Sequence, residues 1–500
     1  MIKKTLQISF LSFAGSLLGF LCQLFIAKYF GATSSFDLFV VASTYPLFLT
    51  GLIAITLNHY LIPELAKRKN IKIQSKFYFL IFLSFIAFFI ITVIFGYFIA
   101  PFQLLYFGAS ENSEYINIAR IYWVCAALNP ILGLFQSVHI VKNNIIYVTK
   151  AHLIPILMSL SFLLVFKNSD GIIILAYSLL TGTILNIFFL ARSCLFDMTP
   201  YRIKLKDYSV LKLFFKRMTL IVLSILCYIV FQSSDVYWCK FLPTSSLSYV
   251  SYMQRFLVAF TALNMSTPIQ LFLPYLSNQI NSGKKNDALM SIIKIFRVSI
   301  TLIIFQSIFF YIYSEEIISA LLQRGLFDEL ATKNVAKLIS ISIFSSIFNV
   351  GSTLLLRFLL AEYKYKITAA SGIFIAVTYF VMSGLLTKNL GLIGIPIAYS
   401  ISWGFYFIKL LSHVFRSKWK LIFNTYNFVF LRNILFNSFL FLLIGFIIKN
   451  ICGEIIGTSG FGIIYLTIIF LVMSVIYLLL IIKIFPLEDL TYLYKKYFHD

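Results

Sequence analysis

The sequence is poor in charged residues, and above all in acidic ones. Of its 500 residues, 60% are hydrophobic and only 12% are charged, with 18 acidic residues against 41 lysines and arginines. A soluble protein cannot bury that much apolar surface, so the composition predicts a polytopic membrane protein. The net charge of +23 does not indicate nucleic-acid binding. The basic residues lie between apolar segments, where they set topology and meet anionic membrane lipids.

The sequence also lacks motifs of catalysis and metal binding. It contains no nucleophile elbow, P-loop, zinc motif or pair of catalytic carboxylates. Its six cysteines, at positions 22, 125, 194, 227, 239 and 452, form no CxxC pair and are expected to be buried hydrophobes. The linkers between apolar segments are at most about 20 residues long, too short for a nucleotide domain or a large catalytic loop. We therefore expect no enzyme, no metal site and no cofactor.

What the sequence does contain is a series of long apolar segments. A helix needs about 20 apolar residues to cross the hydrocarbon core of a membrane. Fourteen segments qualify: about 5–27, 37–62, 77–100, 117–141, 147–166, 171–193, 214–236, 247–273, 290–313, 335–360, 367–387, 390–412, 430–449 and 460–484. The first runs past Leu24, which is too long for a signal peptide, so we expect an uncleaved first span. The predicted fold class is an all-α polytopic membrane protein with 14 transmembrane helices.

The linkers alternate in charge along the chain. Those after even-numbered spans are basic, as in Lys67–Lys76, Arg202–Lys212 and Arg416–Lys420. Those after odd-numbered spans are mixed or acidic, as in Glu315–Glu316, and Lys388 alone breaks the pattern. Because basic linkers stay on the inner side of the membrane, both termini are predicted to face the cytoplasm.

The sequence repeats itself at an offset that is about 211 residues in the first segments and increases further along the chain. The corresponding pairs are Lys28–Ser34 with Lys240–Ser246, Ile62–Leu65 with Leu273–Leu276, Leu104–Gly108 with Leu321–Gly325, and Ala176–Ser178 with Ala398–Ser400. Each repeat holds six spans, an even number, so both enter the membrane from the same side as parallel lobes. We predict an N-terminal lobe at 1–205, a C-terminal lobe at 206–415 and an extra helix pair at 416–500. Membrane proteins built from two such lobes are mostly transporters.

Three of the charged residues inside or at the ends of spans are candidates for a functional site, because charge there is costly and usually faces an internal cavity. Arg255 lies about two turns inside span eight. It either snorkels to the outer headgroups or faces a cavity, and we favour the cavity because an anionic ligand requires a fixed cation. Asp37 begins span two and is either a helix cap or a cavity residue. Asp235, at the outer end of span seven, is either interfacial or binds a cation.

Several short motifs occur in the order and spacing of a known family. They are Gly19–Phe20, Ile26–Ala32, Asp37–Ala42, Pro46, Ser234–Asp235, Phe241–Pro243, Tyr252–Arg255, Leu322–Phe327 and Asn389–Gly394. Together they resemble the MurJ/MviN lipid II flippases over residues 1–415. The resemblance implies the multidrug/oligosaccharidyl-lipid/polysaccharide exporter fold. In that fold two six-helix lobes enclose a cationic cavity, and the extra helix pair forms a groove for a polyprenyl tail.

The sequence departs from this family at several charged positions of the cavity. Cys22 aligns with the family's arginine in span one, Thr50 with its arginine near the middle of span two, and Gln254 with the acid before the span-eight arginine. Of that charged set Asp37 and Arg255 remain. The resemblance thus implies a substrate site at these five residues that carries less positive charge than the family pattern.

A second departure concerns cation binding. Some members of the family bind sodium between spans seven, eleven and twelve. Asp235 matches one ligand of that site, whereas Tyr379 and Ser383 replace its other polar or acidic ligands. The resemblance therefore implies only part of an ion site, at Asp235 and Ser383, and transport is expected to be coupled either to the membrane potential or to a cation.

The sequence thus predicts a flippase of the bacterial inner membrane. Its substrate would be a polyprenyl-pyrophosphate-linked glycan precursor, lipid II by family default, carried from the cytoplasmic to the outer leaflet by alternating access. Three alternatives stay open: a flippase for O-antigen, capsule or exopolysaccharide repeat units, a cation-coupled drug exporter of the same fold, and a scaffold protein without transport. The expected partners are the glycan lipid and anionic membrane lipids, without nucleic acid, and we expect a monomer.

Overall fold

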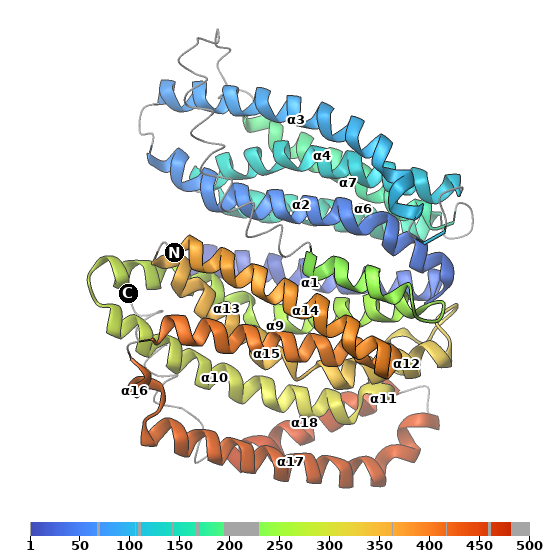
Figure 1. Cartoon of the computed structure of the whole chain (residues 1–500), viewed down its shortest axis with the longest axis vertical. Coiled ribbons are helices and arrows are strands. Elements are labelled where there is room, and N and C mark those ends of the chain that lie inside the picture. The colour runs from blue at the N-terminus through green and yellow to red at the C-terminus, as the bar shows by residue number, and fades with distance from the viewer. Residues whose placement is uncertain are drawn as a thin grey trace. The chain divides into compact units, whose positions relative to one another are not determined.

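The chain folds into helices that form two compact units (Figure 1). The computed structural model describes residues 2–67, 71–105, 107–108, 112–142, 144–166, 171–194, 230–362, 364–416, 418–458 and 462–481. Every regular element in these ranges is a helix, as the sequence predicts. The units are Met1–Ser248 and Tyr249–Asp500. The predicted lobe boundaries at 205 and 415 stay predictions; the first lies, with most of span seven, outside the described residues.

The described part contains eight helices that are long and apolar enough to cross a membrane. The number is nine if the bent pair Glu329–Ser342 and Ser345–Ala361 counts as one span. One candidate, Lys366–Val414, covers two of the predicted spans, and Ile464–Leu480 is a shorter apolar helix. These helices confirm a multi-pass membrane protein, while the total of fourteen spans stays a prediction.

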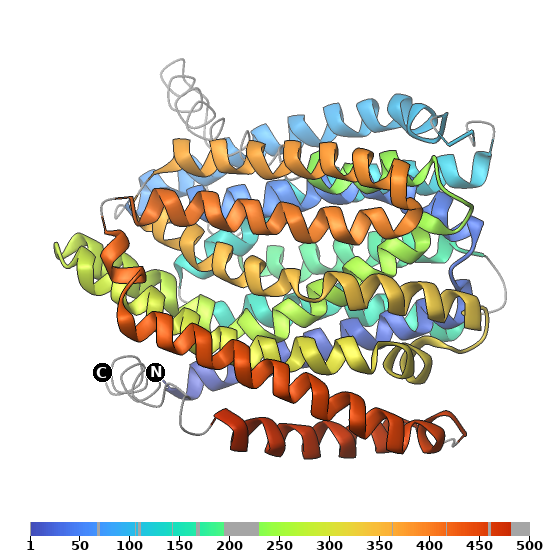
Figure 2. The same ribbon diagram turned by 60° about the horizontal axis from the view of Figure 1, so that its bottom comes forward.

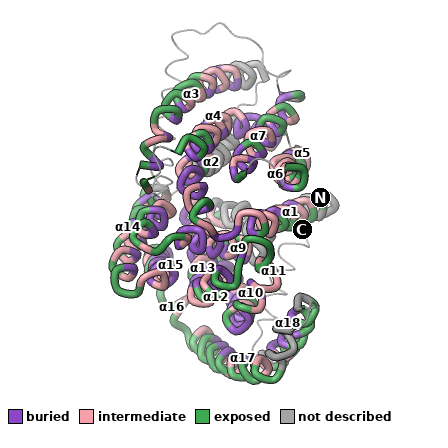
Figure 3. The backbone as a smooth tube through the Cα atoms, turned by 90° about the vertical axis from the view of Figure 1, so that its right-hand side faces the viewer, coloured by how far each residue is buried: buried purple, intermediate pink, exposed green. Residues whose placement is uncertain are grey.

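The first unit is organised around helix α4. Its helices are α1 (Ile2–Phe30), α2 (Ser34–Lys67), α3 (Ile71–Leu105), α4 (Ser113–Val141), α5 (Ile145–Ala151), α6 (Leu153–Val165) and α7 (Ile173–Cys194). Helix α4 packs against α2, α3 and α7, and is buried along most of its length (Figure 3). The side chain of Asn112 accepts a hydrogen bond from the Glu114 amide at 3.2 Å and so caps the start of α4.

The second unit contains a longer series of helices. They are α9 (Ser246–Asn281, of which the first three residues belong to the first unit), α10 (Lys285–Ile312), α11 (Ser314–Leu322), α12 (Glu329–Ser342), α13 (Ser345–Ala361), α14 (Tyr365–Leu390), the 3-10 turn η2 (Gly391–Ile393), α15 (Gly394–Val414), α16 (Trp419–Ile422), α17 (Thr425–Thr458) and α18 (Gly462–Ile481). Helix α15 packs against α12, α13 and α14.

Helices α12 and α13 meet at a bend of 49°. The hydroxyl of Ser345 donates to the Ser342 carbonyl at 2.6 Å, and the hydroxyl of Ser400 reaches the Ile341 carbonyl at 3.5 Å. These two serines donate hydrogen bonds to backbone carbonyl groups at the bend, where the regular backbone hydrogen bonds of the helix are interrupted.

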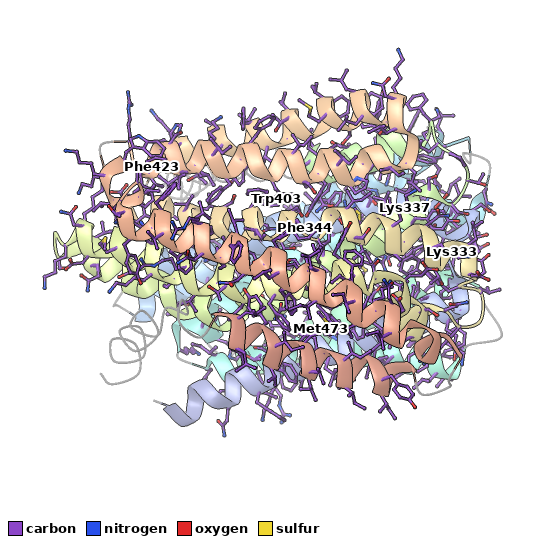
Figure 4. All side chains as sticks on the ribbon, turned by 90° about the horizontal axis from the view of Figure 1, so that it is seen from below. Lys333, Lys337, Phe344, Trp403, Phe423 and Met473 are labelled. Atoms are coloured by element: carbon purple, nitrogen blue, oxygen red, sulfur yellow. The ribbon has the colours of Figure 1, made fainter. Side chains whose placement is uncertain are left out.

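The C-terminal helices α17 and α18 pack against α10 and α11 of the same unit (Figure 2). Their shared core includes Phe305 and Ile312 of α10, Phe441 of α17 and Met473 of α18, the last labelled in Figure 4. The hydroxyl of Tyr477 also donates to the Thr301 carbonyl at 2.8 Å. The predicted extra helix pair is therefore packed on the second unit through an aromatic core with polar links.

Candidate functional site

Arg255 lies on the less buried side of helix α9. On the opposite side Met253 and Leu257 are fully buried, whereas Val258, one turn from Arg255, is 60% exposed. Gln254 and Arg255 themselves are half-buried, and both make polar or electrostatic contacts. The helix therefore presents an amide and a guanidinium on a face that the apolar core of the second unit leaves accessible.

Asp37 lies in the first turn of α2, and its carboxylate accepts hydrogen bonds from the start of α9. Its Oδ2 accepts from the Ser245 amide at 2.7 Å, and its Oδ1 accepts from the Ser248 amide at 2.6 Å. The Ser248 hydroxyl also contacts Oδ1 and lies 3.1 Å from the Thr33 carbonyl oxygen. Asp37 thus caps the start of α9 rather than of its own helix, and its negative charge interacts favourably with the positive end of the α9 dipole.

One of the two amides that Asp37 binds, that of Ser245, belongs to a strained turn directly before α9. Ser245 has a φ of 71°, in the left-handed region that a residue with a side chain rarely adopts. The carboxylate of Asp37 helps to hold that conformation. The repeat places Asp37 and Ser248 at corresponding positions, and the structure brings these two residues into direct contact.

Thr50 and Cys22 lie in different helices of the first unit. The Thr50 hydroxyl donates to the Pro46 carbonyl at 3.0 Å and accepts from the Asn129 side-chain amide at 3.4 Å. The same amide group donates to the Cys125 carbonyl at 2.7 Å. Cys22 is buried in α1. Asn129, which contacts Thr50, was not among the predicted site residues. The sequence feature that could have indicated it is an asparagine directly before Pro130 inside a predicted span.

The two residues of the predicted ion site belong to different units. Asp235, in the first unit, is 3% exposed and has polar or electrostatic contacts. Ser383 of α14 is fully buried, and its hydroxyl has no hydrogen-bond partner among the described residues. Tyr379, one turn earlier, is buried edge-to-face against Tyr399 at 5.8 Å. The Asp235 carboxylate and the Ser383 hydroxyl are each oxygen donors of the kind that hard cations accept.

Long apolar helices in two compact units are typical of a multi-pass membrane transporter, and the sequence predicts an arginine inside one of its spans. The profile of the lipid II flippase MurJ family matches residues 26–465. The chain therefore belongs to the MurJ lipid II flippase family. It is accordingly a multi-pass inner-membrane protein of a family of transporters rather than of enzymes.

Solved structures of two kinds share the fold. A lipid II flippase MurJ in an inward closed conformation has a TM-score of 0.74 at 20% identity, covering 94% of this chain and 98% of that one. An inward-facing multidrug resistance MATE transporter of the MOP superfamily has a TM-score of 0.62 at 11% identity, covering 81% and 96%. A MATE transporter of Vibrio cholerae has a TM-score of 0.57 at 16% identity, covering 84% and 98%. No curated protein matches the sequence.

Proposed function

We propose that this protein flips a polyprenyl-pyrophosphate-linked glycan, with lipid II as the first candidate, from the cytoplasmic to the outer leaflet. A charged pyrophosphate head cannot cross hydrocarbon unaided, because burying an unpaired charge is prohibitively costly. A guanidinium can pair with phosphate oxygens in two parallel hydrogen bonds. The polyprenyl tail stays in the lipid while the head passes by alternating access.

The observation that carries this proposal is the position of Arg255. It lies inside the predicted eighth span and is half-buried, on the side of α9 turned away from the buried residues Met253 and Leu257. A cation kept at this depth in a member of a flippase family is well placed to bind an anionic head group. Asp37, Cys22, Thr50 and Gln254 are proposed as the other residues of the substrate site.

The test is complementation of a strain in which the native protein is depleted. Arg255→Ala should abolish growth or glycan export while the protein still inserts in the membrane. Arg432→Ala is the matched control, because that arginine is exposed on α17. Normal export by Arg255→Ala would remove Arg255 from the site and leave the proposal without its main support.

A second substrate, the repeat unit of a surface polysaccharide, is favoured by the neutral residues Cys22 and Thr50. Two uncharged side chains at these positions leave a less cationic site than the family pattern implies. Depletion followed by analysis of lipid-linked precursors separates the two substrates. Accumulation of lipid II supports the first candidate, and accumulation of another polyprenyl-linked glycan supports the second.

A cation-coupled drug exporter is the third candidate, and the MATE-like fold is the observation behind it. The helix pair α17 and α18 favours a lipid-linked substrate, because such exporters usually have twelve spans and this pair is predicted to lie beyond that number. We propose that transport uses the membrane potential, or a cation at Asp235 and Ser383. Export assays in vesicles, with the membrane potential and the sodium gradient collapsed separately, test both energy sources.

The protein is proposed to act as a monomer among anionic lipids, without a cofactor.

A further inference from the structure

The turn between α11 and α12 contains the motif Leu322–Phe327, which the proposed site does not use. The Arg324 guanidinium donates to the Ala320 carbonyl at 2.9 Å and so serves the end of α11. Gly325 has a φ of 62°, which only a glycine adopts without strain. The Asp328 carboxylate accepts from the Ala331 amide at 2.8 Å and caps the start of α12. This turn is therefore held in one conformation at both of its ends.

The fixed turn directs one aromatic side chain inward. Phe327 is 1% exposed, whereas its neighbour Leu326 is 60% exposed. The Phe327 ring meets the ring of Tyr252 on α9 edge-to-face, with centroids 5.2 Å apart and planes at 89°. Tyr252 is itself buried. The turn thus places one ring against α9 close to Arg255.

Tyr252 precedes Arg255 by three residues, so the two side chains are neighbours on the surface of α9. A second aromatic contact restrains the same helix, since Phe256 and Phe260 both meet Phe310 of α10 edge-to-face, at 5.2 and 5.4 Å. A helix held by rings on one side cannot rotate freely about its own axis. These contacts therefore set the direction in which Arg255 points.

We propose that Phe327 is a positioning residue for Arg255. Through Phe327, the turn between α11 and α12 fixes the rotation of α9 about its own axis. The inference rests on the proposed role of Arg255 in binding a pyrophosphate head. A guanidinium lies about 6 Å from its helix axis, so a rotation of about 20° moves it by about 2 Å. That movement is enough to break a bidentate contact with phosphate oxygens.

The first test measures binding of undecaprenyl pyrophosphate to the purified protein in nanodiscs, with undecaprenol as the uncharged control ligand. Phe327→Ala should lower the affinity about 3- to 10-fold, the range expected for loss of one aromatic pair. Leu326→Ala is the matched control in the same turn and should bind normally. Phe327→Tyr keeps the ring and should retain the affinity.

Two further combinations distinguish positioning from a general loss of stability. In an Arg255→Ala background Phe327→Ala should have no additional effect, because the residue through which it acts is absent. Tyr252→Leu should reproduce the loss caused by Phe327→Ala. If Phe327→Ala does not fold, Phe327→Leu and Tyr252→Leu, which keep apolar volume, take its place. Undiminished affinity in both would overturn the proposal.

The second test reports helix rotation without any substrate. Single replacements Val258→Cys, on the exposed side, and Leu257→Cys, on the buried side, are labelled with a maleimide, and the unsubstituted chain gives the background of the six native cysteines. The position-258 thiol should react faster, and adding Phe327→Ala should reduce the ratio of the two rates. An unchanged ratio would contradict the proposal. If instead Arg255→Ala binds normally, the proposed function fails while the labelling ratio still tests the control of α9.

Discussion

Asp37 and Arg255 are the two charged residues of the predicted substrate site, and they differ in their surroundings. Both carboxylate oxygens of Asp37 accept hydrogen bonds from the first turn of α9. Arg255 lies one turn from the exposed Val258. In the structure the acid stabilises a helix start, while the cation faces away from the core. This difference is the reason why Arg255 carries the proposed function.

Asp37→Asn should destabilise the protein. An amide keeps one acceptor oxygen but loses the charge that meets the α9 dipole, which costs about 1 kcal/mol. The measurement is the midpoint of thermal unfolding in detergent. Ser35→Ala, at an exposed position in the same helix turn, is the control. An equal midpoint for Asp37→Asn and the unsubstituted protein would show that the cap contributes nothing.

Glu362 should make stability depend on pH. Its burial alone would raise its pKa, but hydrogen bonds and charges from Lys285 and Lys364 hold the pKa below its ordinary value of 4.5. The Lys364 ammonium is 2.8 Å away, and Lys285 contacts the other oxygen. A lowered pKa means that the stabilisation is present above pH 4.5 and is lost as the pH falls through the folded-state pKa.

The corresponding experiment compares Glu362→Gln with the unsubstituted protein across a pH series. At pH about 7 the substitution should lower the unfolding midpoint, and the difference should shrink in acid. Glu329→Gln is the control, because the pair of Glu329 with Lys333 is solvent-exposed and such pairs contribute little. A difference that stays constant down to the acid limit would argue against titration of Glu362.

At the scale of elements, the corresponding helices α7 and α15 differ in how closely a glycine approaches the neighbouring helix. A Cβ on Gly182 of α7 would lie 2.6 Å from the Pro155 Cα of α6, a contact with backbone. A Cβ on Gly404 of α15, the same position in the second repeat, would find its nearest neighbour at 3.9 Å, on the Phe348 ring. The repeat conserves the glycine, but only the first copy requires it for close approach.

Gly182→Ala should therefore destabilise the protein by about 1–3 kcal/mol, because overpacking displaces a helix. Gly404→Ala should be neutral or slightly stabilising, since alanine is the better helix former. Thermal unfolding of the two variants side by side is the measurement. Equal effects of the two substitutions would mean that α6 and α7 can separate without cost.

The helix pair α17 and α18 is attached to α10 and α11 through polar links of different kinds. The Lys449 ammonium is 2.7 Å from the Glu316 carboxylate and 2.6 Å from the Ile312 carbonyl. Tyr477 donates one neutral hydrogen bond to Thr301. The first link involves a carboxylate that is mostly withdrawn from solvent, and the second does not.

Lys449→Ala should cost about 1–2 kcal/mol, because it leaves a partly buried charge unpaired. Tyr477→Phe should cost only about 0.6 kcal/mol, the average for interhelical hydrogen bonds in membranes. Unfolding midpoints and limited proteolysis of α17 in detergent rank the two variants. A larger loss of stability for Tyr477→Phe than for Lys449→Ala would show that packing, rather than the ion pair, holds the helix pair in place.

At the scale of the whole molecule, an even number of spans predicts that both termini lie on the same side. The alternation of basic and acidic linkers predicts that this side is the cytoplasm. Cysteines introduced at Lys4→Cys and His499→Cys should be protected from an impermeant maleimide in intact cells and become reactive after permeabilisation. Ser113→Cys, at the start of α4 on the predicted outer side, should react without permeabilisation. Labelling of one terminus in intact cells would contradict the count of fourteen spans.

The sequence by itself determined the class of protein and the family, and it predicted the approximate spans. These depend on composition, on the length of apolar segments and on local motifs, all of which can be read along the chain. It also indicated Arg255 and Asp37, because a charge inside a hydrocarbon-spanning segment is conspicuous whatever it contacts.

Only the tertiary structure decided what these side chains touch. Asp37 and Ser245 are 208 residues apart, and Phe327 lies 75 residues after Tyr252, so no local pattern predicts that they meet. The same holds for Asn129 with Thr50, and for the different packing of Gly182 and Gly404. Such contacts arise when helices distant in sequence pack together, and their distances depend on the side chains of both partners rather than on either segment alone.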